Sequence, residues 1–283
     1  MNKSRWVDHT GNSLVRVLVT GSKGFLGSVL VKKLIKSKNF KVLTDQRFSK
    51  IDLTDFNAVK KLTDEASPDK IIHCAAKVPK SMNHYNDKYS DDIKMIRNLI
   101  DNVECPIIFI SSMTVYGENF TIPVTEDSNL CPKSRYASMK VEVENELRLD
   151  NRKNIIVRLP GLFGYERKKG IIYNLLFGIK YNKKIEIPSE PIVWASMNVS
   201  DAADSIIKLC SKKYQGIDII NLGYDEEQSI NILIEELNQK FNANYLNQIN
   251  HPKFKFDLSR ARRLEILPKN TLSKSLTQLY QVI

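Results

Sequence analysis

No stretch of this 283-residue sequence is apolar over the length that a membrane-spanning helix needs, so we expect no membrane partner. The first residues (1–13) also lack the apolar core of a signal peptide, so we expect a loose leader and a cytoplasmic location. Cysteine is scarce, and its wide spacing matches neither a disulfide framework nor a metal site. We therefore predict reduced thiols and no bound metal. The cysteines are Cys74, Cys105, Cys131 and Cys210.

The sequence also lacks any long basic block, although its formal net charge is +11. Its 43 Lys and Arg residues are scattered along the chain and form no patch with interleaved aromatic residues. This distribution argues against a nucleic-acid partner. A general attraction for small anionic ligands is consistent with the charge.

Residues 15–27 read V-R-V-L-V-T-G-S-K-G-F-L-G, and the rest of the chain is organised around them. The β-branched run at 15–19 is typical of a strand buried on both faces, and a helical pattern follows the glycines. Gly21 would permit a tight turn, Gly24 would let the backbone approach a pyrophosphate, and Gly27 would let the helix pack closely. The pattern predicts a dinucleotide-binding loop, with a glycine-rich surface turn as the alternative.

Strand and helix patterns alternate from residue 15 to 159, which predicts a mostly parallel, doubly wound α/β sheet of the Rossmann type. His73 lies within a buried strand pattern and is interpreted as a buried strand histidine rather than a catalytic one. Ligands of such sheets bind beyond the carboxyl ends of the strands, where the segments 21–27, 75–80 and 111–117 are expected. Further strands are predicted at 40–44, 70–74 and 107–110, and helices at 28–37, 56–65, 89–103 and from Ser134.

Asp45 follows the second predicted strand and lies eighteen residues after Gly27. A nucleotide-binding α/β unit places an acid near this position, where it binds the hydroxyl groups of the adenosine ribose. Arg47 could accept a 2′-phosphate instead, and a simple polar turn is the third interpretation. We expect NAD(H) as the cofactor and leave NADP(H) as the alternative.

Tyr136 and Lys140 are four residues apart and project from one face of a predicted helix. To exchange a proton near neutral pH, a tyrosine must lower its pKa from about 10 to near 7, which costs about 4 kcal/mol. The ammonium of Lys140 and the positive ring of an oxidised nicotinamide are charges that would lower it. Ser112, at the end of a strand, could bind the same substrate oxygen. The three residues predict hydride transfer between a carbinol or ketone and a nicotinamide, with Tyr136 as acid/base.

Together these motifs resemble the extended short-chain dehydrogenase/reductase family of the NAD-dependent epimerase/dehydratase type, whose members modify nucleotide-linked sugars. The resemblance covers nearly the whole chain. It rests on T-G-S-K-G-F-L-G (20–27), I-D-L-T-D (51–55), I-I-H-C-A-A-K (71–77), I-S-S-M-T-V-Y-G (110–117), Y-A-S-M-K (136–140), I-V-R-L-P-G-L-F-G (156–164) and N-V-S-D-A-A (198–203).

The resemblance implies that Tyr136 and Lys140 are the catalytic pair, assisted by Ser112, and that Asp52 and Leu53 contact the adenine. The expected cofactor-binding residues are Gly21, Lys23, Gly24, Phe25, Leu26, Gly27, Asp45, Arg47, Asp52, Leu53, Ala75, Ala76, Lys77, Tyr136, Lys140 and Pro160. The expected substrate-binding residues are Lys77, Ser112, Met113, Thr114, Tyr136 and Gly161.

Departures from the family's patterns narrow the expected reaction. The 4,6-dehydratases carry an acid pair where this chain has Met113 and Thr114, and fucose-synthase-type enzymes carry a cysteine at the position of Thr114. Hexose 4-epimerases usually have an asparagine where this chain has Gly161. The short connection before Asp52 is also more typical of the reductases. We therefore expect reduction of a 4-keto-6-deoxy-hexose at C4, in the biosynthesis of surface-polysaccharide sugars.

Two alternatives stay open: a nucleotide-sugar 4-epimerase with tightly bound NAD, and a non-catalytic dinucleotide sensor or scaffold. The intact set of Ser112, Tyr136 and Lys140 argues against the sensor. We expect a homodimer with a Rossmann domain at 1–160 and a substrate lobe at 161–283 that returns strands to the first domain. Candidates for contact with the substrate nucleotide or its diphosphate are Lys168, Lys169, Lys183, Lys184 and an arginine in 257–264, although a solvated basic face explains the lysines equally well.

Overall fold

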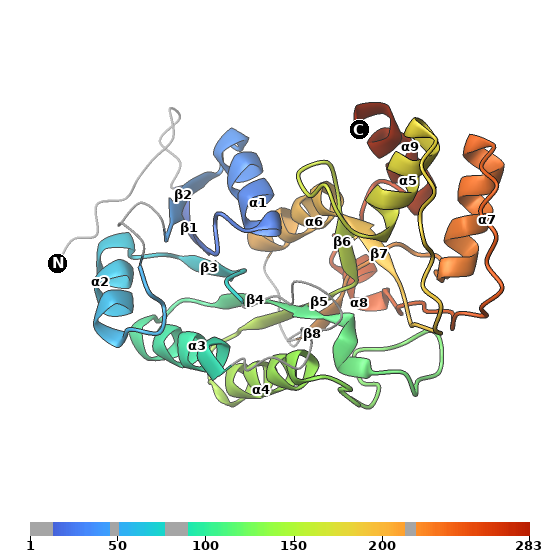
Figure 1. Cartoon of the computed structure of the whole chain (residues 1–283). Coiled ribbons are helices and arrows are strands. Elements are labelled where there is room, and N and C mark those ends of the chain that lie inside the picture. Colours follow the sequence, from blue (N-terminus) through green and yellow to red (C-terminus); the bar gives the residue numbers. More distant parts are fainter. Residues whose placement is uncertain (1–13, 46–50, 77–89, 213–218) are drawn as a thin grey trace.

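The computed structural model describes residues 14–45, 51–76, 90–212 and 219–283, and strands alternate with helices through its first half (Figure 1). In chain order the elements are β1 (Val15–Thr20), α1 (Phe25–Lys36), β2 (Phe40–Thr44), α2 (Phe56–Ala66), β3 (Lys70–His73), α3 (Ser90–Asn102), β4 (Ile107–Ser112), the 3₁₀ turn η2 (Met113–Tyr116), α4 (Arg135–Leu149), β5 (Ile155–Leu159), β6 (Gly161–Phe163), α5 (Ile171–Tyr181), β7 (Ser196–Asn198), α6 (Val199–Ser211), β8 (Ile219–Asn221), α7 (Ile230–Phe241), α8 (Ser259–Arg263) and α9 (Leu272–Val282).

The main sheet has six strands in the order β2-β1-β3-β4-β5-β8, and every neighbouring pair is parallel. The chain passes from β1 outward to β2 and then returns to place β3 on the other side of β1. This reversal between β1 and β3 is the switch point at which doubly wound sheets bind their ligands. The expected fold class is therefore confirmed, and the sheet itself indicates where a ligand belongs.

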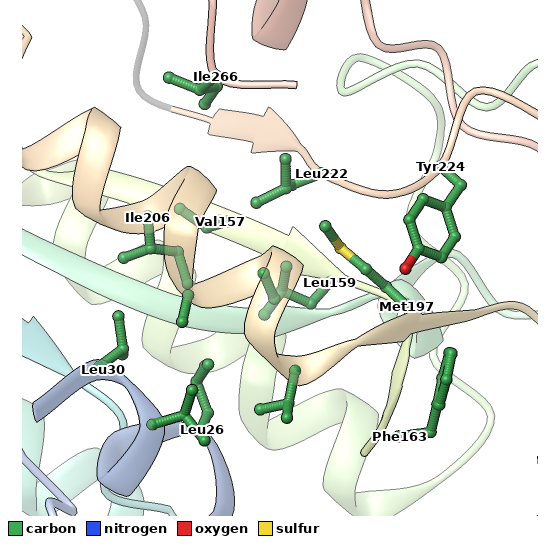
Figure 2. Close-up of a cluster of buried hydrophobic side chains, with 14 of the residues drawn as sticks. Leu26, Leu30, Val157, Leu159, Phe163, Met197, Ile206, Leu222, Tyr224 and Ile266 are labelled. Carbon is green, nitrogen blue, oxygen red and sulfur yellow. The ribbon is translucent and has the colours of Figure 1, made fainter. Parts of the chain in front are cut away.

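Helices cover both faces of this sheet because its strands are apolar on both sides (Figure 1). Helices α1 and α6 pack on one face, where Leu26 and Leu30 of α1 and Ile206 of α6 meet Val157 and Leu159 of β5 (Figure 2). Helices α2, α3 and α4 close the other face with a second apolar cluster. A fully buried leucine or isoleucine stabilises the fold by about 1.5–3 kcal/mol.

After β5 the chain builds a smaller group of elements and then returns to the main sheet. The parallel pair β6-β7 forms a separate two-stranded sheet, and helices α5 and α9 pack together beside it. Strand β8 then joins the edge of the main sheet next to β5. In the described parts of the chain, no helix is long and apolar enough to cross a membrane.

Several helix starts follow from short polar side chains. The side-chain oxygens of Asp55, Ser134 and Ser229 each accept a hydrogen bond from a backbone N–H in the first turn of α2, α4 and α7. Helix α1 begins earlier than the expected residue 28, because the N–H of Ser28 already bonds the carbonyl of Gly24 at 2.9 Å. Strand β4 extends to Ser112, beyond the expected residue 110.

Candidate functional site

The turn after β1 lies directly against the end of β3, at the switch point of the sheet. Gly21 has φ +67°, and a Cβ there would lie 2.6 Å from the backbone nitrogen of Ala75. Only glycine combines this left-handed conformation with so close an approach. The expected tight turn at Gly21 is present, and it brings two of the three expected ligand-binding segments into contact.

The start of α1 has the features of an anion-binding helix end. Its N-cap is the exposed Gly24, which has no side chain, and the first turn carries no acidic residue. A Cβ on Gly27 would lie 2.2 Å from the carbonyl oxygen of Gly21, so the helix packs on the loop itself through the bare Gly27 backbone. The N–H groups and the dipole of such a helix end suit a pyrophosphate.

Asp45 supports the glycine loop, a role that the sequence analysis did not foresee. Its carboxylate is 6% exposed and accepts hydrogen bonds from the Gly21 N–H at 2.9 Å and from the Ser22 hydroxyl at 2.5 Å. These bonds fix a negative charge at the end of β2, beside the loop. Its expected contact with the ribose stays a prediction. Arg47 and Lys77 lie outside the described residues.

Ser112 ends β4 and caps the 3₁₀ turn that follows it. Its Oγ accepts two hydrogen bonds from Thr114, one from the backbone N–H at 3.2 Å and one from the hydroxyl at 3.0 Å. A serine hydroxyl has two acceptor lone pairs and one donor hydrogen. Because both lone pairs are used, the Ser112 hydrogen is left for an acceptor such as a carbonyl oxygen.

Tyr136 and Lys140 lie on the first turns of α4, which packs on β4 and η2. The Lys140 ammonium is buried, lies 5.7 Å from the centroid of the Tyr136 ring, and donates to the carbonyl of Ile110 at 2.9 Å. Burial lowers the pKa of Lys140 to about 8, against the opposing effect of the acidic side chains of Asp92 and Glu144. The group is therefore mostly charged at neutral pH and lies near the phenol.

Two titratable neighbours at the end of β3 are held neutral. Burial and the nearby Lys140 charge lower the pKa of His73 to about 3, and its Nδ1 lies 2.7 Å from the hydroxyl of Thr20. His73 is only 1% exposed, which confirms it as a buried strand histidine. Burial raises the pKa of the Cys74 thiol to about 12. Neither group is suited to proton transfer near neutral pH.

The other expected site residues are placed as follows. Asp52 is exposed, with its carboxylate bonded to the N–H and hydroxyl of Thr54, and Leu53 is buried. The structure buries Leu26, Met113 and Pro160, leaves Phe25, Ala75 and Ala76 half-buried, and exposes Lys23 and Gly161. Their roles toward a cofactor or substrate stay predictions.

Some of the basic residues in the C-terminal half that were expected to contact the substrate are already paired with carboxylates. Arg260 of α8 binds Asp127 at 2.6 Å, and Arg262 binds Asp225 at 2.5 Å. The expected arginine contact with a nucleotide would have to compete with these carboxylates. The four candidate lysines, Lys168, Lys169, Lys183 and Lys184, are all exposed, which fits the solvated basic face equally well.

Comparison with known proteins assigns this arrangement to a family. The family model described as NAD dependent epimerase/dehydratase family matches residues 17–223, which is most of the chain. The chain belongs to the NAD-dependent epimerase/dehydratase family. It is therefore an enzyme-family member with the Rossmann fold, in a group that includes nucleotide-sugar epimerases and reductases.

Relatives within the epimerase/dehydratase family differ in how much of the chain they match. The dTDP-4-dehydro-6-deoxyglucose reductase of Escherichia coli is 29% identical over 264 residues, which is 80% of this chain and 82% of that protein. The UDP-glucose 4-epimerase of Lactobacillus helveticus is 27% identical over 149 residues, so this chain's match spans 46% of its own length and only 45% of that enzyme. Among solved structures, the Bordetella bronchiseptica enzyme WbmG in complex with NAD shares the fold, with TM-score 0.74 and 18% identity over 95% of this chain and 94% of that one.

Two further features of the site in this family member were missed at the sequence level. The bond from the Thr114 hydroxyl to Ser112 was not foreseen, although Thr114 was expected near the substrate. The buried carboxylate of Glu144, which binds Arg158 at 2.6 Å beneath the site, was not considered at all. A sequence signal for this pair exists, because an arginine inside the apolar strand I-I-V-R-L requires a buried partner.

Proposed function

We propose that this protein reduces the C4 carbonyl of a nucleotide-linked 4-keto-6-deoxy sugar with a reduced nicotinamide cofactor. The observation that carries the proposal is the donor set at the end of β4. Both lone pairs of Ser112 are occupied by Thr114, so Ser112 presents a hydrogen to an oxygen that can only accept, as a ketone oxygen does. The phenol of Tyr136, with the Lys140 ammonium 5.7 Å from its ring, supplies the proton.

The described residues fit a dinucleotide. The close approach of Gly21 to Ala75, the bare N-cap Gly24 and the start of α1 form a cradle that would hold the pyrophosphate. When bound, the reduced nicotinamide supplies the hydride that the carbonyl carbon receives. This cradle is the part of the proposal that a Gly24 substitution can test directly.

The protein's own residues handle the charge that develops on the substrate oxygen. As the carbonyl π electrons move onto the oxygen, Ser112 donates a hydrogen bond and Tyr136 donates its phenolic proton. The Lys140 ammonium stabilises the tyrosinate that remains, and a proton from solvent restores the phenol. The thiol of Cys74 and the neutral His73 take no part in this transfer.

The substrate is assigned to the elements after Pro160. Gly161 is exposed at the start of β6, and the small sheet β6-β7 adjoins helix α6, which packs on α1 of the Rossmann domain. This supports the proposed boundary at residue 160, with β8 returning to the first domain.

The free cysteines support a reducing compartment such as the cytoplasm. The expected homodimer stays a prediction, which light scattering after size-exclusion chromatography can test.

The direct test is to incubate the protein with NADH or NADPH and a panel of UDP-, dTDP- and GDP-linked 4-keto-6-deoxy sugars and hexoses. Nicotinamide absorbance and sugar identity are followed together. A reductase must release oxidised cofactor in every cycle, so we expect one nicotinamide oxidised for each sugar reduced.

The 4-epimerase is the second candidate, because an epimerase of this family also needs a donor to a transient ketone, and the Lactobacillus helveticus relative is such an enzyme. Interconversion of hexose epimers without net consumption of nicotinamide would establish it and overturn the reductase. Cofactor binding with no turnover on any sugar would instead favour the sensor or scaffold.

Asp45 is expected to make the protein prefer NADH over NADPH. Its carboxylate is fixed beside the glycine loop, where it would repel a 2′-phosphate and accept bonds from free ribose hydroxyls. The Asp45→Asn variant keeps an oxygen for the Gly21 N–H but removes the charge, so the preference for NADH should fall by about tenfold. The measurement is kcat/KM for both cofactors. A wild-type protein that strongly prefers NADPH would show that Arg47 faces the ribose.

A further inference from the structure

A buried polar cluster lies next to the proposed catalytic residues in the chain and joins β4 and α4, which carry them, to the neighbouring strand β5. Glu144 stands one helical turn after Lys140 on α4, and its Oε1 accepts a hydrogen bond from the Ser111 hydroxyl at 2.5 Å. Arg158 of β5 binds the same carboxylate through Nε at 3.1 Å and Nη2 at 2.6 Å. Ser111 and Arg158 are paired neighbours in the parallel ladder of β4 and β5, so Glu144 bridges two adjacent strands.

The same guanidinium also reaches the turn that begins at Ser112. Its Nη1 donates to the Tyr116 hydroxyl at 2.8 Å and to the carbonyl of Glu126 at 3.0 Å. Tyr116 ends η2, the 3₁₀ turn that Ser112 caps. In the chain, Ser112 therefore lies between two residues whose side chains are fixed by buried hydrogen bonds, Ser111 before it and Tyr116 after it. The Ser111 hydroxyl donates to Glu144 of α4, the helix that carries Tyr136, and the Tyr116 hydroxyl accepts from Arg158, which pairs with the same carboxylate.

Burial makes this arrangement rigid. Glu144 and Arg158 are each 1% exposed, so any movement of α4 along β4 would break charge-assisted bonds without water to replace them. An apolar pair of similar volume would often stabilise a fold as well as a buried ion pair does. An apolar pair would not fix the relative orientation of α4 and β5. The guanidinium does so because its planar N–H groups donate in fixed directions.

We propose that Glu144 and Arg158 are positioning residues, which hold Ser112 and Tyr136 at the separation that one substrate oxygen needs. The proposal rests on the proposed function, because it assigns these residues to that same site. Ser111 completes the unit by linking the strand residue next to Ser112 to the helix. None of the three touches the substrate or the cofactor in this proposal.

The test compares Ser111→Ala and Glu144→Gln with a matched control at the far end of the same helix. Asp150 is the C-cap of α4, and there its carboxylate binds Arg152 Nε at 2.9 Å and Asn154 at 2.8 Å. The Asp150→Asn control thus weakens a partly buried ion pair on α4 that lies far from the site. All variants are assayed well below their unfolding temperatures, so a loss of folded protein cannot imitate a loss of activity.

We expect Ser111→Ala and Glu144→Gln to lower kcat by about tenfold to a hundredfold, because a displacement of about 1 Å can cost that much. Their KM and cofactor affinity should stay near the wild-type values, and Asp150→Asn should keep its kcat. The proposal is overturned if both site variants keep the kcat of the control, or if only KM changes. Ser111→Ala leaves the pair of Glu144 and Arg158 intact, so it remains informative if Glu144→Gln folds poorly.

A spectroscopic readout separates this proposal from the proposed function. The Tyr136 resonance of protein with isotope-labelled tyrosine rings is assigned by its absence from Tyr136→Phe. The chemical shift of this resonance should change in Ser111→Ala and Glu144→Gln and should stay unchanged in Asp150→Asn. This expectation does not depend on the identity of the substrate. A wild-type protein without turnover would overturn the proposed function alone, whereas an unmoved Tyr136 resonance in both site variants would overturn the positioning role.

Discussion

The Tyr136→Phe protein is expected to bind its cofactor as the wild type does and to turn over about 10²- to 10⁴-fold more slowly. The substitution keeps the ring, which packs against the apolar cluster between the sheet and α4, and removes only the hydroxyl. Ser112 would still donate to the substrate oxygen, but no acid would supply the proton. The measurements are kcat by nicotinamide absorbance and cofactor affinity by calorimetry.

Tyr181→Phe provides the matched control for this loss. Tyr181 lies at the end of α5 and is 49% exposed, so removal of its hydroxyl should leave both kcat and the free energy of unfolding unchanged. If Tyr136→Phe retained near-normal turnover while binding cofactor, the phenol would not be the acid. The mechanism would then need another proton donor.

The Gly27→Ala protein is expected to be less stable by about 3 kcal/mol, at the upper end of the usual cost of overpacking. The added Cβ would lie 2.2 Å from the oxygen and 2.9 Å from the carbonyl carbon of Gly21, and both atoms are backbone. The loop must therefore move away from α1. Where a helix has open space around it, the same change would stabilise the fold by about 1 kcal/mol. The expected loss of stability at Gly27 therefore comes from steric crowding. Thermal and denaturant unfolding measure the loss.

The Gly24→Ala protein distinguishes an effect on cofactor binding from an effect on stability. Its added Cβ would lie 3.1 Å from the Gly21 oxygen, a contact that a small shift can relieve, and the position is exposed. We expect nearly normal stability but weaker cofactor binding, because the methyl group would occupy the approach to the pyrophosphate. A Gly27→Ala protein with wild-type stability would mean that the loop is much more adaptable than its backbone contacts indicate.

The glycine loop and the sheet could be predicted because their signals are local. The β-branched run of β1, the glycines after it and the polar caps at Asp55, Ser134 and Ser229 each determine the conformation of their immediate neighbours. The apolar patterns of successive strands then leave few arrangements other than a parallel sheet covered on both faces. The placement of Tyr136 and Lys140 on one turn of α4 follows from helical periodicity alone.

The supporting contacts could not be predicted in the same way, because they join residues that are far apart in the sequence. The contact of Asp45 with the Gly21 N–H depends on how β1 and β2 align, and that of Glu144 with Arg158 depends on the rotation of α4 over the sheet. The arginine in the apolar strand pattern indicates that Arg158 has a buried acidic partner, but it does not indicate which acidic residue that is. The direction of the Thr114 hydroxyl toward Ser112 is likewise a property of the 3₁₀ turn.

The late return of β8 has a consequence for synthesis of the protein. The edge strand beside β5 comes from Ile219–Asn221, and α6, which covers the α1 face, comes from Val199–Ser211. A nascent chain that has reached residue 160 therefore carries a complete glycine loop but an open sheet edge and an uncovered apolar face. Such surfaces promote aggregation during folding. The cofactor-binding half can close only after residue 221 has left the ribosome, so release of the chain before that point would be more damaging than the domain boundary suggests.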